Sequence, residues 1–227
     1  MPTKLQVIYD VKETLKKYSD DSDYENRHIL YLYNLKRAKF LRQLLDDKTR
    51  NFDAILMQSF CLGFKEVSKD LCGITSTCTV LRSVKPLPRL LQVKNRSTLI
   101  SAQFSEAFTQ PLKVIDFLQA PYILDKPYNS GTYLTIDSEN YAFIISKFPE
   151  HKLISCLYFT GIFEDPSELE DYDSCCSCET VKPCFEDDSE YPAQSFLIDL
   201  IRDELVKLFI TTKEQVKEDR DNNSNDD

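Results

Sequence analysis

Apolar residues recur at helical spacing more densely between Ser22 and Leu71 than in any other part of the chain. We interpret this stretch as two long helices packed against each other, one over residues 23–47 and one over residues 52–71. The apolar residues of the first helix cover more than half of its circumference, which predicts two buried faces or one very wide face. They are Ile29, Leu30, Leu32, Tyr33, Leu35, Phe40, Leu41, Leu44 and Leu45. The apolar stripe of the second helix consists of Phe52, Leu56, Phe60, Phe64, Val67 and Leu71.

The segments on either side of this stretch complete an α+β fold. Residues 3–18 and 193–217 each show the pattern of an amphipathic helix, and a short helix is expected after Pro111. The predicted strands are residues 74–84, 90–93, 97–104, 132–137, 141–148 and 153–159. Short polar joints connect the last three strands, which favours an antiparallel meander. We therefore predict an N-terminal helical segment packed with a mainly antiparallel β-sheet and a C-terminal helix.

The negative charge of the chain is concentrated in one segment. Residues 164–190 hold eleven acidic residues and one lysine, a net charge of −10 against −9 for the whole chain, so the remainder is close to neutral. A segment this polar predicts a disordered loop. The expected organisation, within one integrated domain, is a helical segment (1–72), a β-rich region (73–163), a disordered acidic loop that contains cysteines (164–191), a C-terminal helix (192–217) and a disordered tail (218–227).

Several classes of protein do not fit the sequence. The chain has four glycines, all isolated, whereas backbone cradles for phosphate need clustered glycines, so we expect no nucleotide. The N-terminal residues lack the apolar core of a signal peptide, and no apolar run is long enough to span a membrane. Without a secretory route, the eight cysteines are expected to be free thiols or metal ligands in the cytoplasm or nucleus. We expect no cofactor and no membrane partner.

A cysteine cluster in the acidic loop is a candidate metal site, because four thiolates can bind zinc tetrahedrally. The candidate ligands are Cys175, Cys176, Cys178 and Cys184. Their spacing lacks the paired CxxC motifs of zinc ribbons, so a cysteine-rich loop without metal is the alternative that we favour. The two histidines, His28 and His151, have no nucleophile motif beside them. We therefore predict no catalytic residue, and an enzyme with an unrecognised cysteine or acidic site stays open as a further alternative.

Two basic clusters could meet an acidic partner. Residues 27–50 carry seven basic and two acidic residues, and residues 82–96 carry five basic and no acidic residues. The second cluster consists of Arg82, Lys85, Arg89, Lys94 and Arg96. Joined in the fold, the two clusters would form a patch able to contact nucleic-acid phosphates. The alternatives are solvated surface, or an acidic loop that lies across the bases and neutralises them.

The apolar surface of the predicted elements exceeds what one small core needs, which is typical of a subunit of a permanent complex. A central, buried second helix would explain the same pattern. The apolar surplus and a basic cluster coincide on the helix predicted over residues 23–47. The predicted partner-binding residues are therefore Tyr33, Arg37, Lys39, Phe40, Arg42 and Leu44.

From these observations we predict a non-enzymatic structural or adaptor subunit of an intracellular, hetero-oligomeric protein complex. Helices followed by a small β region are the layout of some eukaryotic replication and kinetochore subunits. This layout is the basis for expecting a nuclear, chromosome-associated role, and it serves as a prior only, because layout alone does not fix function. A nucleic-acid-associated factor that contacts phosphates through the basic clusters is the first alternative.

Overall fold

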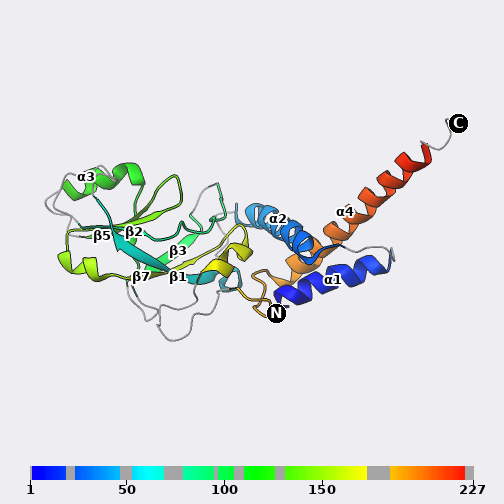
Figure 1. Ribbon diagram of the computed structural model, residues 1–227, viewed down its shortest axis with the longest axis horizontal. Coiled ribbons are helices and arrows are strands. Elements are labelled where there is room, and N and C mark those ends of the chain that lie inside the picture. Colours follow the sequence, from blue (N-terminus) through cyan, green and yellow to red (C-terminus); the bar gives the residue numbers. More distant parts are fainter. Residues whose placement is uncertain are drawn as a thin grey trace. The chain divides into compact units, whose positions relative to one another are not determined.

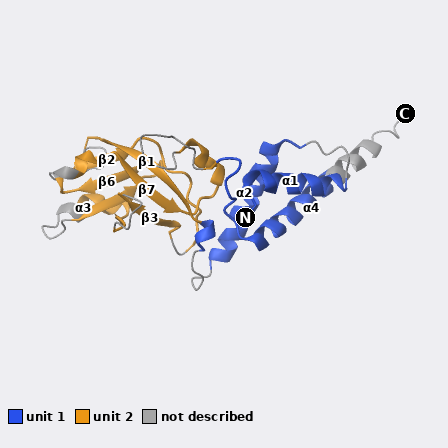
Figure 2. Cartoon of the chain, turned by 90° about the horizontal axis from the view of Figure 1, so that it is seen from below, with its two compact units in different colours: residues 1–56, 186–227 blue, residues 57–185 orange. Residues whose placement is uncertain are grey.

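The computed structural model describes residues 2–18, 24–46, 53–68, 79–94, 97–104, 110–125, 131–172 and 185–222. The chain divides into two compact units (Figure 2). We call residues 1–56 together with 186–227 the helical unit, and residues 57–185 the sheet unit. The combination of helices with a mostly antiparallel sheet confirms the predicted α+β class.

The described residues of the helical unit form three α-helices and a short 3₁₀ helix. They are α1 (Lys4–Lys16), α2 (Asn26–Leu45), η1 (Ala54–Leu56) and α4 (Ser195–Asn222). The three α-helices contact one another side by side (Figure 1). Val11, Leu41 and Ile201 are fully buried members of their shared core. Thr3 and Gln6 form a capping box at the start of α1, in which each side chain accepts a hydrogen bond from the backbone N–H of the other.

The end of the acidic segment runs beside the start of the chain. Thr3 and Glu190 form an antiparallel bridge, Lys4 N donates to Ser189 O at 3.1 Å, and Tyr191 N donates to Pro2 O at 3.0 Å. The predicted disordered loop is therefore structured here, since the buried Tyr191 side chain anchors the backbone. The cysteine-containing centre of the loop, residues 173–184, lies outside the described residues.

The described strands of the sheet unit form one seven-stranded sheet in the order β3-β7-β1-β2-β6-β5-β4. Their bounds are β1 (Gln58–Glu66), β2 (Thr79–Ser83), β3 (Leu99–Gln103), β4 (Lys113–Val114), β5 (Thr132–Ile136), β6 (Ala142–Ser146) and β7 (Cys156–Gly161). The helical turns of this unit are η3 (Phe117–Gln119), α3 (Ala120–Asp125), η4 (Pro149–Leu153) and η5 (Pro166–Asp171). All strand pairs are antiparallel except β4 with β5, which is parallel.

The two edges of this sheet are linked through the segment that leads into β4. Leu112 N donates to Ala102 O of β3 at 2.8 Å, while the next two residues pair with β5 at the opposite edge. The segment thus runs from the edge strand β3 to the opposite edge, where it becomes the edge strand β4. Its hydrogen bond occupies one backbone carbonyl of β3, at Ala102.

The helix predicted over residues 52–71 is wrong, because most of that stretch is η1 and strand β1. Phe60 and Phe64 are four positions apart, a spacing that places two residues on one face of a helix and also on one face of a strand. Phe60, Leu62 and Phe64 are all buried, which follows the two-residue period of a strand. Aromatic residues also favour strands, and here that preference agrees with the tertiary packing.

Three further expectations for the sheet unit need correction. The predicted meander holds only for β5 and β6, because β7 pairs with β1 and β3 rather than with β6. The strand expected over residues 90–93 is reduced to isolated bridging, with Leu90 opposite Phe163. The short helix expected after Pro111 begins later, since Lys113–Val114 is the edge strand β4.

Candidate protein interface

Two of the predicted partner-binding residues lie in the core of the helical unit. The hydroxyl of Tyr33 donates to Ile198 O at 3.1 Å, and its ring meets the Tyr191 ring edge-on at 5.2 Å between centroids. Arg37 is fully buried, and its Nε donates to Pro192 O at 2.7 Å. Burial raises the pKa of Tyr33 far above its ordinary value. Within this unit both side chains hold α2 against α4 and the segment before it, so the face of α2 that carries them is buried in the core of the unit.

The other predicted partner-binding residues are more accessible. Lys39 is exposed, whereas Phe40, Arg42 and Leu44 are half-buried. The Lys39 ammonium lies 5.8 Å from the centre of the Phe40 ring. Binding of a partner through these four residues stays a prediction.

Helix α2 also presents an exposed line of side chains that sequence reasoning did not single out. Tyr31 and Leu35 are 59% and 51% exposed, and Arg27 and Lys39, four positions before and after them, are exposed as well. Residues four apart share one face of a helix. We call Arg27, Tyr31, Leu35 and Lys39 the basic strip.

Helix α4 presents a comparable line with the opposite charge. Phe196 and Leu200 are 52% and 43% exposed. Asp199 lies between them in the sequence and Asp203 follows them, and both aspartates are exposed on the same face of the helix. We call Phe196, Asp199, Leu200 and Asp203 the acidic strip. Phe196 and Leu200 belong to the apolar stripe of the amphipathic helix predicted over residues 193–217, and an apolar stripe alone does not show which part of it a neighbour covers.

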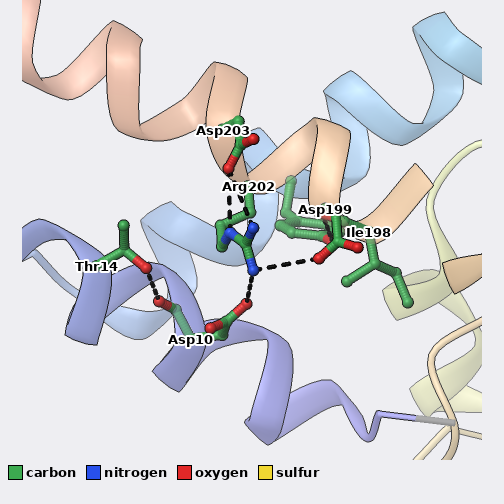
Figure 3. Close-up of polar contacts among 7 residues, drawn as sticks. Asp10, Thr14, Ile198, Asp199, Arg202 and Asp203 are labelled. Carbon is green, nitrogen blue, oxygen red and sulfur yellow. Dashed lines mark hydrogen bonds and ion pairs between the residues drawn. The ribbon is translucent and has the colours of Figure 1, made fainter. Parts of the chain in front are cut away.

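Arg202 connects the acidic strip to helix α1 (Figure 3). Its Nη1 lies 3.1 Å from Asp10 Oδ2 and 3.2 Å from Asp199 Oδ1, and its Nε lies 3.2 Å from Asp203 Oδ1. The hydrogen bond with Asp10 raises the pKa of the Arg202 guanidinium, and the bond with Asp203 adds to the rise. Three aspartates surround one arginine, so this side of the unit keeps a negative charge while α1 is held against α4.

The second basic cluster belongs to the sheet unit and is already engaged within the chain. Arg82 stacks on the Tyr141 ring at 3.7 Å, and the Arg89 guanidinium lies 3.3 Å from the Glu168 carboxylate. Lys94 is exposed, and Arg96 lies outside the described residues. Residues 27–50 belong to the other unit, so no joint basic patch is described, and phosphate contact through these residues stays untested.

The acidic segment covers part of this cluster through η5. Lys85 Nζ donates to Asp171 O at 2.7 Å, and the Tyr172 hydroxyl donates to Pro86 O at 2.5 Å. Leu169, which precedes Asp171 and Tyr172 in the sequence, is fully buried. The start of the predicted disordered loop is thus structured too. The ion pair between Arg89 and Glu168 is an instance of the alternative in which the acidic loop lies across the basic residues and neutralises them.

Tyr172 gives this contact a pH dependence. Burial raises the pKa of Tyr172 to about 12, and the carboxylates of Glu168 and Asp171 add to the rise. An unfolded tyrosine ionises near pH 10, so the stabilisation is complete below that pH and is lost as the pH rises from about 10 to about 12. We expect the unfolding free energy of the sheet unit to fall over this interval, and to fall less in Tyr172→Phe.

Urea unfolding at several pH values, followed by circular dichroism, measures this difference. The ultraviolet absorbance of tyrosinate, wild type minus Tyr172→Phe, should show a transition near pH 12. Identical pH dependence of the two proteins above pH 10 would contradict the assignment.

The histidines do not form a catalytic group among the described residues. His151 Nδ1 lies 2.8 Å from Ser146 Oγ and 2.9 Å from Thr132 Oγ1, but Ser146 is fully buried at a cross-strand pair. A nucleophile must be accessible to its substrate, so this contact is a structural tie between β5, β6 and η4. His28 is exposed and packs near the Phe209 ring.

Metal and membrane sites receive no support from the described residues. The four candidate zinc ligands, Cys175, Cys176, Cys178 and Cys184, all lie outside them. In the part of the chain that is described, no three His, Cys, Asp or Glu side chains come together as a metal site. None of the described helices is long and apolar enough to cross a membrane.

The amino-acid sequence resembles known proteins over nearly its whole length, and the resemblance is not confined to one unit. A family model described as phage tail ring protein 2 matches residues 6–227. Ring protein 2 of Bacteroides phage crAss001 is 26% identical over 223 residues, which cover 98% of this chain and 96% of that relative. The matched region includes both the helical unit and the sheet unit.

Proposed function

This chain belongs to the phage tail ring protein 2 family, and from that membership we propose that it is a structural subunit of a ring in a phage tail. The observation that carries the proposal is the match over residues 6–227, which spans most of the helical unit and all of the sheet unit. The relative that aligns over nearly its full length is also called a ring protein.

The same family corrects several predictions. The expected nuclear complex, the nuclear location and the chromosome-associated role are wrong, because the family is one of phage tail proteins. The prediction that the chain is not an enzyme is confirmed by its membership of a structural family. Assembly with other protein subunits follows from the same membership, whereas a nucleic-acid partner gains no support from it.

Ring formation makes a physical demand that the helical unit can meet. A closed ring of identical copies uses two different surfaces on each subunit, one for each neighbour. The basic strip on α2 and the acidic strip on α4 are two such exposed surfaces within one unit. We further propose that the ring docks on different tail proteins, so that the final assembly is hetero-oligomeric.

Purified virions of a phage that encodes this chain test the proposal. We expect mass spectrometry to find the protein in intact virions. Its copy number per virion should be a whole-number multiple of the number of subunits in one ring. Gold-labelled antibodies against the chain should bind the tail rather than the capsid. Absence of the protein from virions that contain the other tail proteins would refute the proposal.

A further inference from the structure

We propose that neighbouring copies in the ring bind each other by placing the basic strip of one copy against the acidic strip of the next. The occupant of each strip is thus a second copy of this chain. The inference rests on the proposed function, because it uses the repeated arrangement of identical subunits in a ring. It adds the residues that make the contact and the direction in which the copies are joined.

The basic strip has the composition of a small helix-binding face. Tyr31 and Leu35 supply apolar area at its centre, and Arg27 and Lys39 place one positive charge at each end. The two charged residues are twelve positions apart, which corresponds to about 18 Å along the helix axis. Tyr31 and Leu35 lie on the side of α2 opposite Tyr33, the residue that packs against α4.

The acidic strip carries the complementary set of groups. Phe196 and Leu200 again supply an apolar pair with a spacing of four residues. Asp199 and Asp203 are exposed carboxylates on that face, and the negative charge of Asp10 beside Arg202 leaves the region acidic. The buried face of α4, which includes Leu197, Ile201 and Leu205, is used within the unit and points away from the strip.

The charges decide which pairing is favourable. Two basic strips or two acidic strips brought together would oppose like charges, which costs several kcal/mol at an interface. A basic strip against an acidic strip instead brings opposite charges together beside four apolar side chains. Within one copy both strips remain exposed, so the pairing is made between copies. Repeated head to tail, it joins unlike surfaces, which is the type of contact that closes a ring.

Charge reversal in the full chain tests this contact. The first variant carries Arg27→Glu and Lys39→Glu, so both of its strips are acidic. The second carries Asp199→Lys and Asp203→Lys, so both of its strips are basic. Sedimentation velocity over a range of concentrations should show self-association that is at least about tenfold weaker for either variant than for wild type. An equimolar mixture of the two variants should recover association, because acidic and basic copies can then alternate.

A matched control separates this effect from a general change of charge. Lys16→Glu with Lys17→Glu reverses two exposed lysines at the end of α1, outside both strips, and should associate like wild type. Circular dichroism should show the same helix content in all variants. The wild-type association should weaken as salt is added, since exposed charge pairs are screened.

Crosslinking in the assembled particle provides a second measurement. A carbodiimide joins the Lys39 amine to the Asp199 or Asp203 carboxylate as an amide with loss of water, and mass spectrometry of treated virions should identify that peptide pair. Unchanged self-association of both variants, or no recovery in their mixture, would overturn the inference. So would a wild type that stays monomeric together with virions that give no such crosslink. These results leave the proposed function intact when the protein is found in the tail, whereas its absence from virions would refute the function itself.

Discussion

Replacement of Phe60 with alanine should lower the unfolding free energy of the sheet unit by about 3 to 5 kcal/mol. Phe60 on β1 is fully buried, and its ring lies 5.5 Å from Phe159, 5.5 Å from Phe163 and 5.0 Å from Tyr172 between centroids. Loss of the ring removes buried apolar area and opens a cavity that strands β1 and β7 cannot close, because their backbones are paired from Gln58 to Gly63.

Hydrogen exchange followed by mass spectrometry measures the loss of stability separately in the sheet unit and in the helical unit. Peptides of β1 and β7 should exchange much faster in Phe60→Ala than in wild type. The control is Leu153→Ala in η4, whose side chain is 87% exposed, and whose effect should stay within about 0.5 kcal/mol. A Phe60→Ala protein as stable as this control would show that the aromatic cluster does not hold the sheet unit together.

Arg37→Ala should destabilise the helical unit by about 3 kcal/mol. The side chain of Arg37 is fully buried on α2, and its Nε donates to the carbonyl of Pro192. Alanine removes both the packed volume and the donor, so the Pro192 carbonyl loses its partner away from water. The segment that leads into α4 should then detach from α2 more often.

A graded series separates packing from hydrogen bonding at this position. Arg37→Met keeps most of the packed volume without a donor, so it should lose less stability than Arg37→Ala. Gln43→Ala, at an exposed position of the same helix, should be nearly neutral. Urea unfolding with hydrogen exchange in α2 and α4 measures all three, and equal stability of Arg37→Ala and Gln43→Ala would contradict a structural role for Arg37.

The sequence predicted the helices well because their period is local. The helices expected over residues 3–18, 23–47 and 193–217 correspond to α1, α2 and α4. Strand β1 was missed because Phe60 and Phe64 satisfy the helical and the strand period equally. The partners of β7 were missed for a different reason, since pairing between residues about 100 positions apart depends on the whole topology rather than on short joints.

The candidate interface was predictable only in part. Helix α2 carries apolar residues on more than one side, and no local pattern distinguishes the face that packs within the unit from the face that stays exposed. Tyr33 and Arg37 were therefore placed on the surface, although Tyr191 and Pro192, more than 150 positions later, cover them. The proposed role in a tail ring had no local signal at all, because a structural surface needs no fixed motif.

The helical unit is built from two stretches of chain that are separated by the whole sheet unit. During translation, α1 and α2 leave the ribosome first. Their apolar faces can pack against α4 only after Ser195 and the following residues have emerged. The sheet unit, which is continuous, is free to fold before that moment. A nascent copy therefore cannot present its acidic strip until late in synthesis, so the proposed contact between copies forms only after the sheet unit has been made.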